Sequence, residues 1–283
     1  MSKAFDSKIQ KRVQAFVEHM LQYTVRLVRL NAKLKPIEGA ASGFILNREG
    51  SQYLISAGHV FRSGGDWGVE TDMVVSGETV VIPVSSIQLI SRVTLDSSEG
   101  AVDAFQALLA TSEVIELAEV QKYCSDPTAS PEPLDIAWTE LSIAKLRETL
   151  SADDRLKNVT WSLPAYTGPV DVDPSSSEPY GFAAYSRVEF HQDISRLLRE
   201  EAYEVGMQFV GIDPKHDLYR FKLARNHQGD AYYKGSSGAP IADPTGKIVA
   251  IVVCGSEADN IIYGFPIRRI GNLLKLKHAP EKV

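Results

Sequence analysis

Residues 42–56 have the sequence Ser42-Gly43-Phe44-Ile45-Leu46-Asn47-Arg48-Glu49-Gly50-Ser51-Gln52-Tyr53-Leu54-Ile55-Ser56. Two short apolar runs flank a polar turn that contains glycine, a pattern typical of two strands joined by a hairpin. Residues 24–30 form a further strand-like run, rich in valine and leucine. Short strands separated by polar turns favour an antiparallel β fold over a parallel sheet with helices between its strands.

The rest of the chain extends this pattern, with helices predicted at a few places. Apolar residues at positions 9, 13, 16, 17 and 20 share one helical face, so residues 1–23 are predicted to form a helix. A helical insert is predicted at about residues 97–124, and a stretch rich in proline, glycine and serine predicts a linker at residues 164–180. Short helices are also expected at 142–150 and 267–276. Further strands are predicted at 73–75, 80–84, 87–89, 134–138, 182–185, 203–210, 218–223, 247–253 and 261–265.

The composition is that of an ordinary globular protein. The 283 residues are 44% hydrophobic and 23% charged, and 30 Lys and Arg against 36 Asp and Glu leave a net charge of −6. This balance argues against a nucleic-acid-binding protein, which needs an excess of cations on one face. Cys124 and Cys254 are too few for a disulfide framework or a cysteine-rich zinc site. Because we find no secretory leader and no run of about 18 apolar residues, we expect a cytoplasmic protein without a membrane partner.

Three short strings hold residues that together carry hydrolytic chemistry. They are residues 55–60 with His59, residues 134–137 with Asp135, and residues 234–240 with Ser237. A serine hydroxyl becomes a nucleophile when a neutral histidine takes its proton, and a carboxylate can fix that histidine. Glycines beside a serine permit a tight turn whose backbone N–H groups can hold an oxyanion.

Six motifs in the same order resemble the chymotrypsin/trypsin-like serine peptidases, and especially their bacterial HtrA-like branch. The resemblance covers about residues 24–276, without the PDZ-like domain of standard HtrA proteins. Two positions depart from the family pattern: Ser236 replaces the acid before the nucleophile, and Ala239 replaces the second glycine after it. The motifs are Ser42-Gly43-Phe44-Ile45-Leu46, Ala57-Gly58-His59-Val60, Leu134-Asp135-Ile136-Ala137, Gly235-Ser236-Ser237-Gly238-Ala239-Pro240, Gly246-Lys247-Ile248-Val249-Ala250-Ile251 and Tyr263-Gly264-Phe265-Pro266-Ile267.

This resemblance implies an all-β (mainly) fold of two six-stranded antiparallel β-barrels, the chymotrypsin fold, with an N-terminal helix at residues 1–23. The first barrel would span residues 24–163 and contain the helical insert at about 97–124. The linker at 164–180 would join it to a second barrel with a C-terminal helix, residues 181–283.

The resemblance also implies the roles of the site residues in a trypsin-like serine endopeptidase that works through an acyl-enzyme. His59 would be the general base, Asp135 would orient it, and Ser237 would be the nucleophile. The oxyanion hole would be the backbone turn of Gly235, Ser236 and Ser237. No metal or other cofactor is expected.

The substrate would be a protein or peptide. In the family, a carboxylate six positions before the nucleophile selects Lys or Arg, but this position is Ala231 here. We therefore expect an apolar residue of small to medium size before the scissile bond (P1), with an acidic residue attracted by Lys234 as the alternative. The residues expected to line the substrate site are Ala231, Lys234, Val253, Cys254, Gly255 and Ile261.

Other interpretations stay open at this point. Asp103 is the main rival of Asp135, because the insert blurs the alignment. The chain is alternatively an inactive pseudoprotease that binds peptides or proteins. It is also alternatively a latent enzyme, activated by a regulatory protein partner or by cleavage within residues 97–133.

Several further side chains are given structural expectations. An α/β-hydrolase elbow is excluded, because it needs glycine two residues after the serine, where Ala239 stands. His191, His216 and His227 are expected at the surface. Cys254 is expected to be a small buried residue in the cleft wall.

Overall fold

The computed structural model describes residues 3–32, 36–62, 64–75, 78–84, 86–92, 98, 104, 121–126, 132–141, 163–191 and 196–271. The chain divides into a large compact unit, Met1–Gln88 with Ile136–Val283, and a small unit, Leu89–Asp135. Each unit is described by itself. None of the helices in the described part of the chain is long and apolar enough to cross a membrane.

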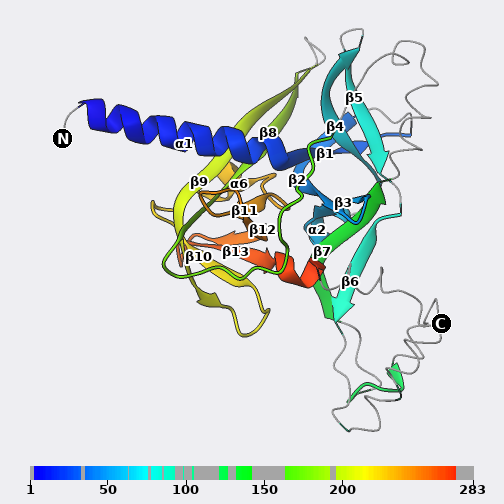
Figure 1. Ribbon diagram of the computed structural model, residues 1–283. Coiled ribbons are helices and arrows are strands. Elements are labelled where there is room, and N and C mark those ends of the chain that lie inside the picture. The colour runs from blue at the N-terminus through cyan, green and yellow to red at the C-terminus, as the bar shows by residue number, and fades with distance from the viewer. Residues whose placement is uncertain are drawn as a thin grey trace. The chain divides into compact units, whose positions relative to one another are not determined.

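Helix α1 (Lys3–Tyr23) continues directly into strand β1 (Thr24–Leu30). Its last turns are packed, with Val17 and Met20 buried, and the helix runs beside β8 (Figure 1). The hydroxyl of buried Thr24 lies 3.0 Å from the carbonyl oxygen of Met20 and 2.9 Å from that of Ala183. This single side chain therefore joins the helix end to a strand of the second half of the unit.

The first sheet is antiparallel, and its strand order in the large unit is β5-β4-β1-β2-β3-β7. The predicted hairpin is confirmed: β2 pairs with β3, from Phe44 opposite Ile55 to Arg48 opposite Ser51. Glu49 and Gly50 make the turn with positive φ values. The bounds are β2 Pro36–Arg48, β3 Ser51–Ser56, β4 Asp66–Val75, β5 Glu78–Val84 and β7 Glu132–Leu141.

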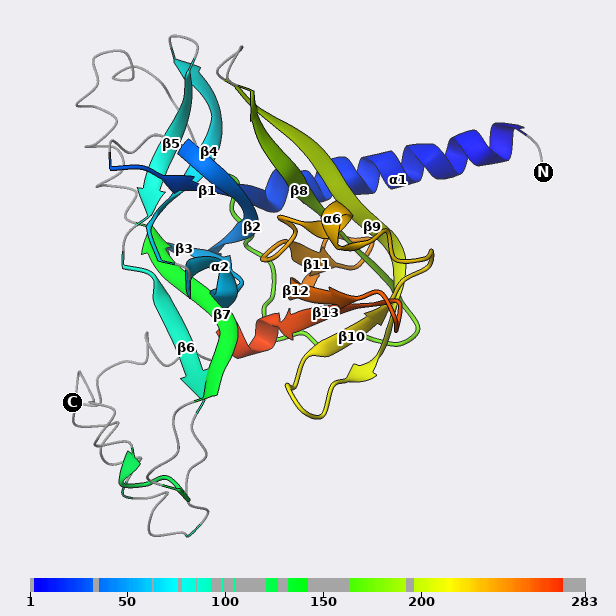
Figure 2. The ribbon, with the colours of Figure 1, turned by 180° about the vertical axis from the view of Figure 1, so that it is seen from behind.

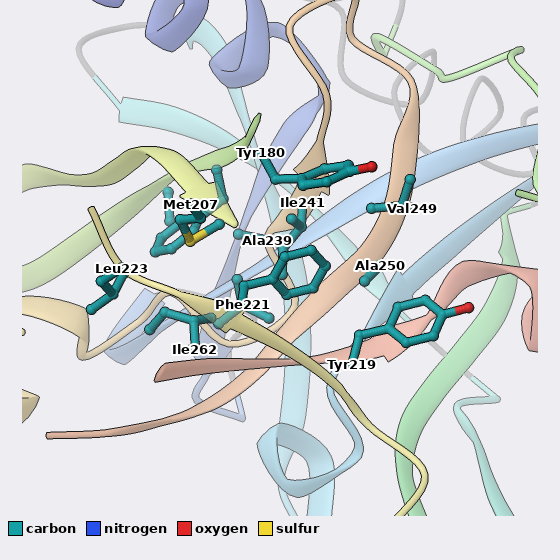
Figure 3. Packing of buried hydrophobic residues seen from close by; sticks show 13 residues of the cluster. Tyr180, Met207, Tyr219, Phe221, Leu223, Ala239, Ile241, Val249, Ala250 and Ile262 are labelled. Atoms are coloured by element: carbon teal, nitrogen blue, oxygen red, sulfur yellow. The ribbon is translucent and has the colours of Figure 1, made fainter. Parts of the chain in front are cut away.

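The second sheet closes into a six-stranded barrel, in the order β10-β13-β12-β11-β8-β9 (Figure 2). Its interior is a cluster of buried aromatic and aliphatic side chains, which include Phe221 and Ile241 (Figure 3). Phe182, Phe221 and Ile241 are fully buried. The bounds are β8 Pro179–His191, β9 Arg196–Ile212, β10 Tyr219–Lys222, β11 Pro240–Ala242, β12 Ile248–Ser256 and β13 Ile261–Pro266.

The mainly β fold with two antiparallel sheets is confirmed, and the second of them is a closed six-stranded barrel as predicted. The first sheet differs in detail, because its strand order in the large unit is open. Strand β6 (Gln88–Arg92) lies in the small unit from Leu89 onward. Three short elements escaped prediction: α2 (Gly58–Arg62), α6 (Asp230–Tyr233) and β11.

The remaining predicted segments are only partly covered. Most of the predicted insert at 97–124 and all of the predicted helix at 142–150 lie outside the described residues. Residues 267–271 are helical, and the rest of the predicted C-terminal helix lies outside the described residues. In the predicted linker, Tyr166 bridges to Leu46, and β8 begins at Pro179.

Candidate active site

His59 and Ser237 meet although they come from the two different sheets. Strand β3 ends at Ser56, and the short helix α2 that follows carries His59. Ser237 lies in the turn between α6 and β11. His59 Nε2 is 3.0 Å from Ser237 Oγ, within hydrogen-bond distance. The predicted base and nucleophile are therefore adjacent in the folded chain.

The backbone before Ser237 is a type II turn over residues 233–236. Lys234 has φ −59° and ψ 118°, Gly235 has φ 99°, and the N–H of Ser236 donates to the carbonyl oxygen of Tyr233 at 2.9 Å. A type II turn needs a positive φ at its third residue, which is the physical reason for glycine at position 235. The Lys234–Gly235 peptide is thereby turned over relative to its orientation in a type I turn.

This turn determines which backbone N–H groups are available beside Ser237. The N–H of Ser236 is used in closing the turn. Within the described residues, the N–H groups of Gly235 and Ser237 donate no hydrogen bond. Of the three residues predicted to form the oxyanion hole, Gly235 and Ser237 thus keep a donor for a ligand, whereas Ser236 does not.

Ser42 of strand β2 fixes the serine turn to the first sheet. Its N–H donates to the carbonyl oxygen of Ser237 at 2.9 Å, and its hydroxyl donates to that of Gly235 at 2.9 Å. Its own carbonyl oxygen accepts from the hydroxyl of Ser56 at 2.6 Å. Ser42 and Ser56 are both fully buried. The sequence places Ser42 in a motif, but only the structure shows that it holds the backbone of Gly235 and Ser237.

Gly238 permits this close approach. Its φ is 90°, and a Cβ built on it would lie 2.0 Å from the carbonyl oxygen of Ser42 and 2.3 Å from Ser56 Oγ. Any side chain would therefore separate the serine turn from the first sheet.

A cleft of about 640 Å³ opens beside the pair and is lined by residues of both sheets. Five of the six residues expected at the substrate site line it: Ala231, Lys234, Val253, Cys254 and Gly255. The sixth, Ile261, is buried and does not line the cleft; its neighbour Ile262 does. Successive residues of a strand point to opposite faces, so a one-residue offset exchanges the two side chains.

Two expectations about this region are wrong. Cys254 was expected to be buried, but it is exposed, because β12 leaves the barrel core after Val253. His227 was expected at the surface, but only 9% of it is exposed and it lines the cleft. His216 is exposed as expected and is paired with Asp213.

Asp135 lies in β7 and is half-buried. It is two residues before Ala137, which pairs with Ser56 three residues before His59. Asp135 itself belongs to the small unit, so its role in orienting His59 stays a prediction. Its rival Asp103 lies outside the described residues.

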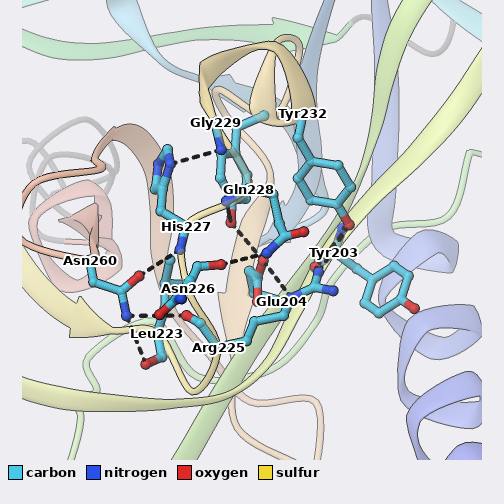
Figure 4. A network of polar contacts seen from close by, with 11 residues as sticks. Tyr203, Glu204, Leu223, Arg225, Asn226, His227, Gln228, Gly229, Tyr232 and Asn260 are labelled. Carbon is cyan, nitrogen blue, oxygen red and sulfur yellow. Dashed lines mark hydrogen bonds and ion pairs between the residues drawn. The ribbon is translucent and has the colours of Figure 1, made fainter.

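A buried polar network, which sequence reasoning missed, flanks the cleft (Figure 4). The carboxylate of Glu204, 1% exposed, accepts hydrogen bonds from Arg225 Nε at 3.0 and 3.1 Å and from the hydroxyl of Tyr233 at 2.6 Å. The hydrogen bond with Glu204 raises the pKa of Arg225, and burial raises the pKa of Tyr233. Arg225 thus stays charged and Tyr233 stays a donor over the physiological range.

Comparisons with known proteins give a fold resemblance alone. No family model and no curated protein matches the chain. Among solved structures, it is similar to a serine endoprotease from Yersinia pestis, with 11% sequence identity and a TM-score of 0.46 over 93% of this chain and 67% of that chain. The chemistry assigned to this chain therefore rests on its own residues.

Proposed function

We propose that this protein is a serine endopeptidase that cleaves protein or peptide substrates through an acyl-enzyme on Ser237. The observation that carries the proposal is the 3.0 Å separation of His59 Nε2 and Ser237 Oγ at the edge of an open cleft. A nucleophile within hydrogen-bond reach of its base is the geometric requirement for this chemistry.

In the proposed mechanism, His59 takes the proton of Ser237 Oγ while that oxygen attacks the peptide carbonyl carbon. The N–H groups of Gly235 and Ser237 stabilise the resulting oxyanion. His59 then gives the proton to the leaving amine, and a water molecule activated by the same histidine hydrolyses the acyl-enzyme. Asp135 is assigned the orientation of His59, on the ground of the motif and its place in β7.

The type II turn supports an active resting enzyme over a latent one. With a positive φ at Gly235, the N–H of this residue is turned away from the turn's own hydrogen bond and is available to a substrate. The substrate backbone is proposed to lie along residues 253–255 of β12. The carbonyl oxygen of Val253 is 3.5 Å from Ser237 Oγ, so a peptide placed there has its scissile bond near the nucleophile.

The first test is intact-mass spectrometry after treatment with a fluorophosphonate, which modifies an activated serine. We expect one adduct on the wild-type protein and none on Ser237→Ala or His59→Ala. Loss of either residue is expected to reduce peptide hydrolysis by at least about 10³-fold, because both act in the same step. His216→Ala, an exposed histidine paired with Asp213, serves as the matched control and should be labelled like the wild type.

An unlabelled, folded wild-type protein would contradict the proposal and favour the pseudoprotease interpretation. Circular dichroism of all four proteins distinguishes this result from misfolding.

A further inference from the structure

His227 is held with its proton on Nε2. Its Nδ1 accepts a hydrogen bond from the N–H of Gly229 at 3.1 Å, so in the neutral ring the proton lies on the other nitrogen. Its backbone N–H donates to Asn260 Oδ1 at 2.7 Å, which fixes the residue to the loop before β13. The ring is therefore held by the N–H of Gly229, and the backbone of His227 is held by the side chain of Asn260, as Figure 4 shows.

The Nε2 of His227 is directed toward the cleft. A Cβ built on Gly255 would lie 2.8 Å from this nitrogen, and both residues line the cleft together with Ala231. The nitrogen is buried and has no hydrogen-bond acceptor within the described residues. A buried donor without an acceptor is rare in folded proteins and points to a partner that arrives from outside.

The ring is also supported from behind. Tyr233 packs against it with ring centroids 4.5 Å apart, and the Tyr233 hydroxyl is held by Glu204. Arg225 neutralises Glu204 through Nε. The charged pair thus lies behind Tyr233, while His227 presents a neutral N–H to the cleft.

We propose that His227 selects the P1 residue of the substrate by donating Nε2–H to a neutral side-chain oxygen, and that the preferred residue is glutamine. This inference rests on the proposed peptidase function. An apolar P1 side chain would leave the buried donor without an acceptor. A carboxylate would lose its hydration opposite a single neutral donor, which is unfavourable.

Glutamine also fits the rest of the cleft. Its unbranched side chain passes Gly255, which carries no side chain against the buried Nε2. Ala231 provides no carboxylate for Lys or Arg. This assignment replaces the apolar P1 residue expected from Ala231 alone.

The test uses the full-length protein and fluorogenic tetrapeptide amides that differ only at P1, with mixed residues at P2–P4. Methionine has nearly the shape of glutamine but lacks the amide, so the Gln/Met ratio of kcat/KM reports this hydrogen bond. We expect a ratio of about 10 to 100 in the wild type, with Glu and Lys below Gln. His227→Phe keeps a ring but removes Nε2–H, and its ratio should fall to about 1. His216→Phe is the matched control and should keep the wild-type ratio.

The outcomes separate this inference from the proposed function. A wild type that is labelled by fluorophosphonate but cleaves after Met as well as after Gln overturns the inference and leaves the peptidase proposal standing. A Gln preference that persists in His227→Phe also overturns it. A wild type that is neither labelled nor active overturns both. If His227→Phe fails to fold, Gly255→Ala, whose Cβ covers Nε2, should lower the Gln/Met ratio instead.

Discussion

The closed barrel and the open sheet contribute to the candidate site in different ways. In the barrel every strand has a neighbour on both sides, whereas in the described order of the first sheet β5 is an edge strand beside β4. The barrel forms the serine turn with its own elements, α6 and β11. The sheet supplies His59 after the interior strand β3, and Ser42 joins the two halves. The candidate site therefore depends on the contact between the halves, because neither half contains both His59 and Ser237.

The largest effect is expected from a cavity in the barrel. Phe221 is fully buried and lies against the rings of Tyr180 and Tyr219. Phe221→Ala should lower the free energy of unfolding by about 3–5 kcal/mol, measured by urea denaturation. Phe209 lies on the half-buried rim of the same cluster, so Phe209→Ala is the matched control. It should lower the free energy of unfolding by less than Phe221→Ala does. If both variants lost the same free energy of unfolding, the interior of the barrel would contribute no more to stability than its rim.

Separating the two halves is expected to lower stability less than the cavity in the barrel does, but it should also lower the reactivity of Ser237. Gly238→Ala should be destabilised by roughly 2 kcal/mol and should react with fluorophosphonate at least about 100-fold more slowly, because its Cβ displaces the turn from Ser42. Gly50→Ala isolates the backbone strain, since Gly50 has φ 85° with nothing within 4 Å of its Cβ. The free energy of unfolding of this control should fall by about 1 kcal/mol, and its rate of labelling by fluorophosphonate should equal that of the wild type. A Gly238→Ala protein with normal labelling would mean that the halves do not need this close contact.

The smallest effect is expected from loosening the junction at one hydrogen bond. Ser42→Ala removes the donor to the carbonyl oxygen of Gly235 but keeps the backbone bond to Ser237. We expect about 1 kcal/mol of destabilisation and roughly a 10-fold lower kcat with an unchanged KM, because the oxyanion donors lose orientation. Ser51→Ala removes an exposed hydroxyl bonded to Glu140 and provides the comparison. If Ser42→Ala changed KM but left kcat unchanged, Ser42 would contribute to substrate binding instead.

Sequence reasoning was most successful for elements with a repeated pattern. The hairpin of β2 and β3 and the strands around it were predicted because alternation and turn residues act locally. Helices α2 and α6 and strand β11 have three to five residues, too few for a period to be visible. The order of the motifs brought His59 and Ser237 to attention, and the structure places them together.

The residues that sequence reasoning missed depend on contacts between distant segments. His227 is buried because Asn260, 33 residues later, holds its backbone, and a lone histidine carries no pattern that predicts this. Glu204 in β9 binds Arg225, which follows the neighbouring strand β10 and is 21 residues away. Ser42 reaches Gly235 across 193 residues. In each case, the partner is determined by the register and closure of the sheets.

The pair His59 and Ser237 is separated by 178 residues of sequence. Contacts of such long range form late, because the loop-closure entropy must be offset by structure already present. While the chain is being synthesised, a segment that ends before Ser237 contains His59 but not the hydroxyl that lies beside it in the folded chain. The candidate site is therefore a product of complete folding, and under the proposed function folding intermediates with exposed strands are spared cleavage by their own chain.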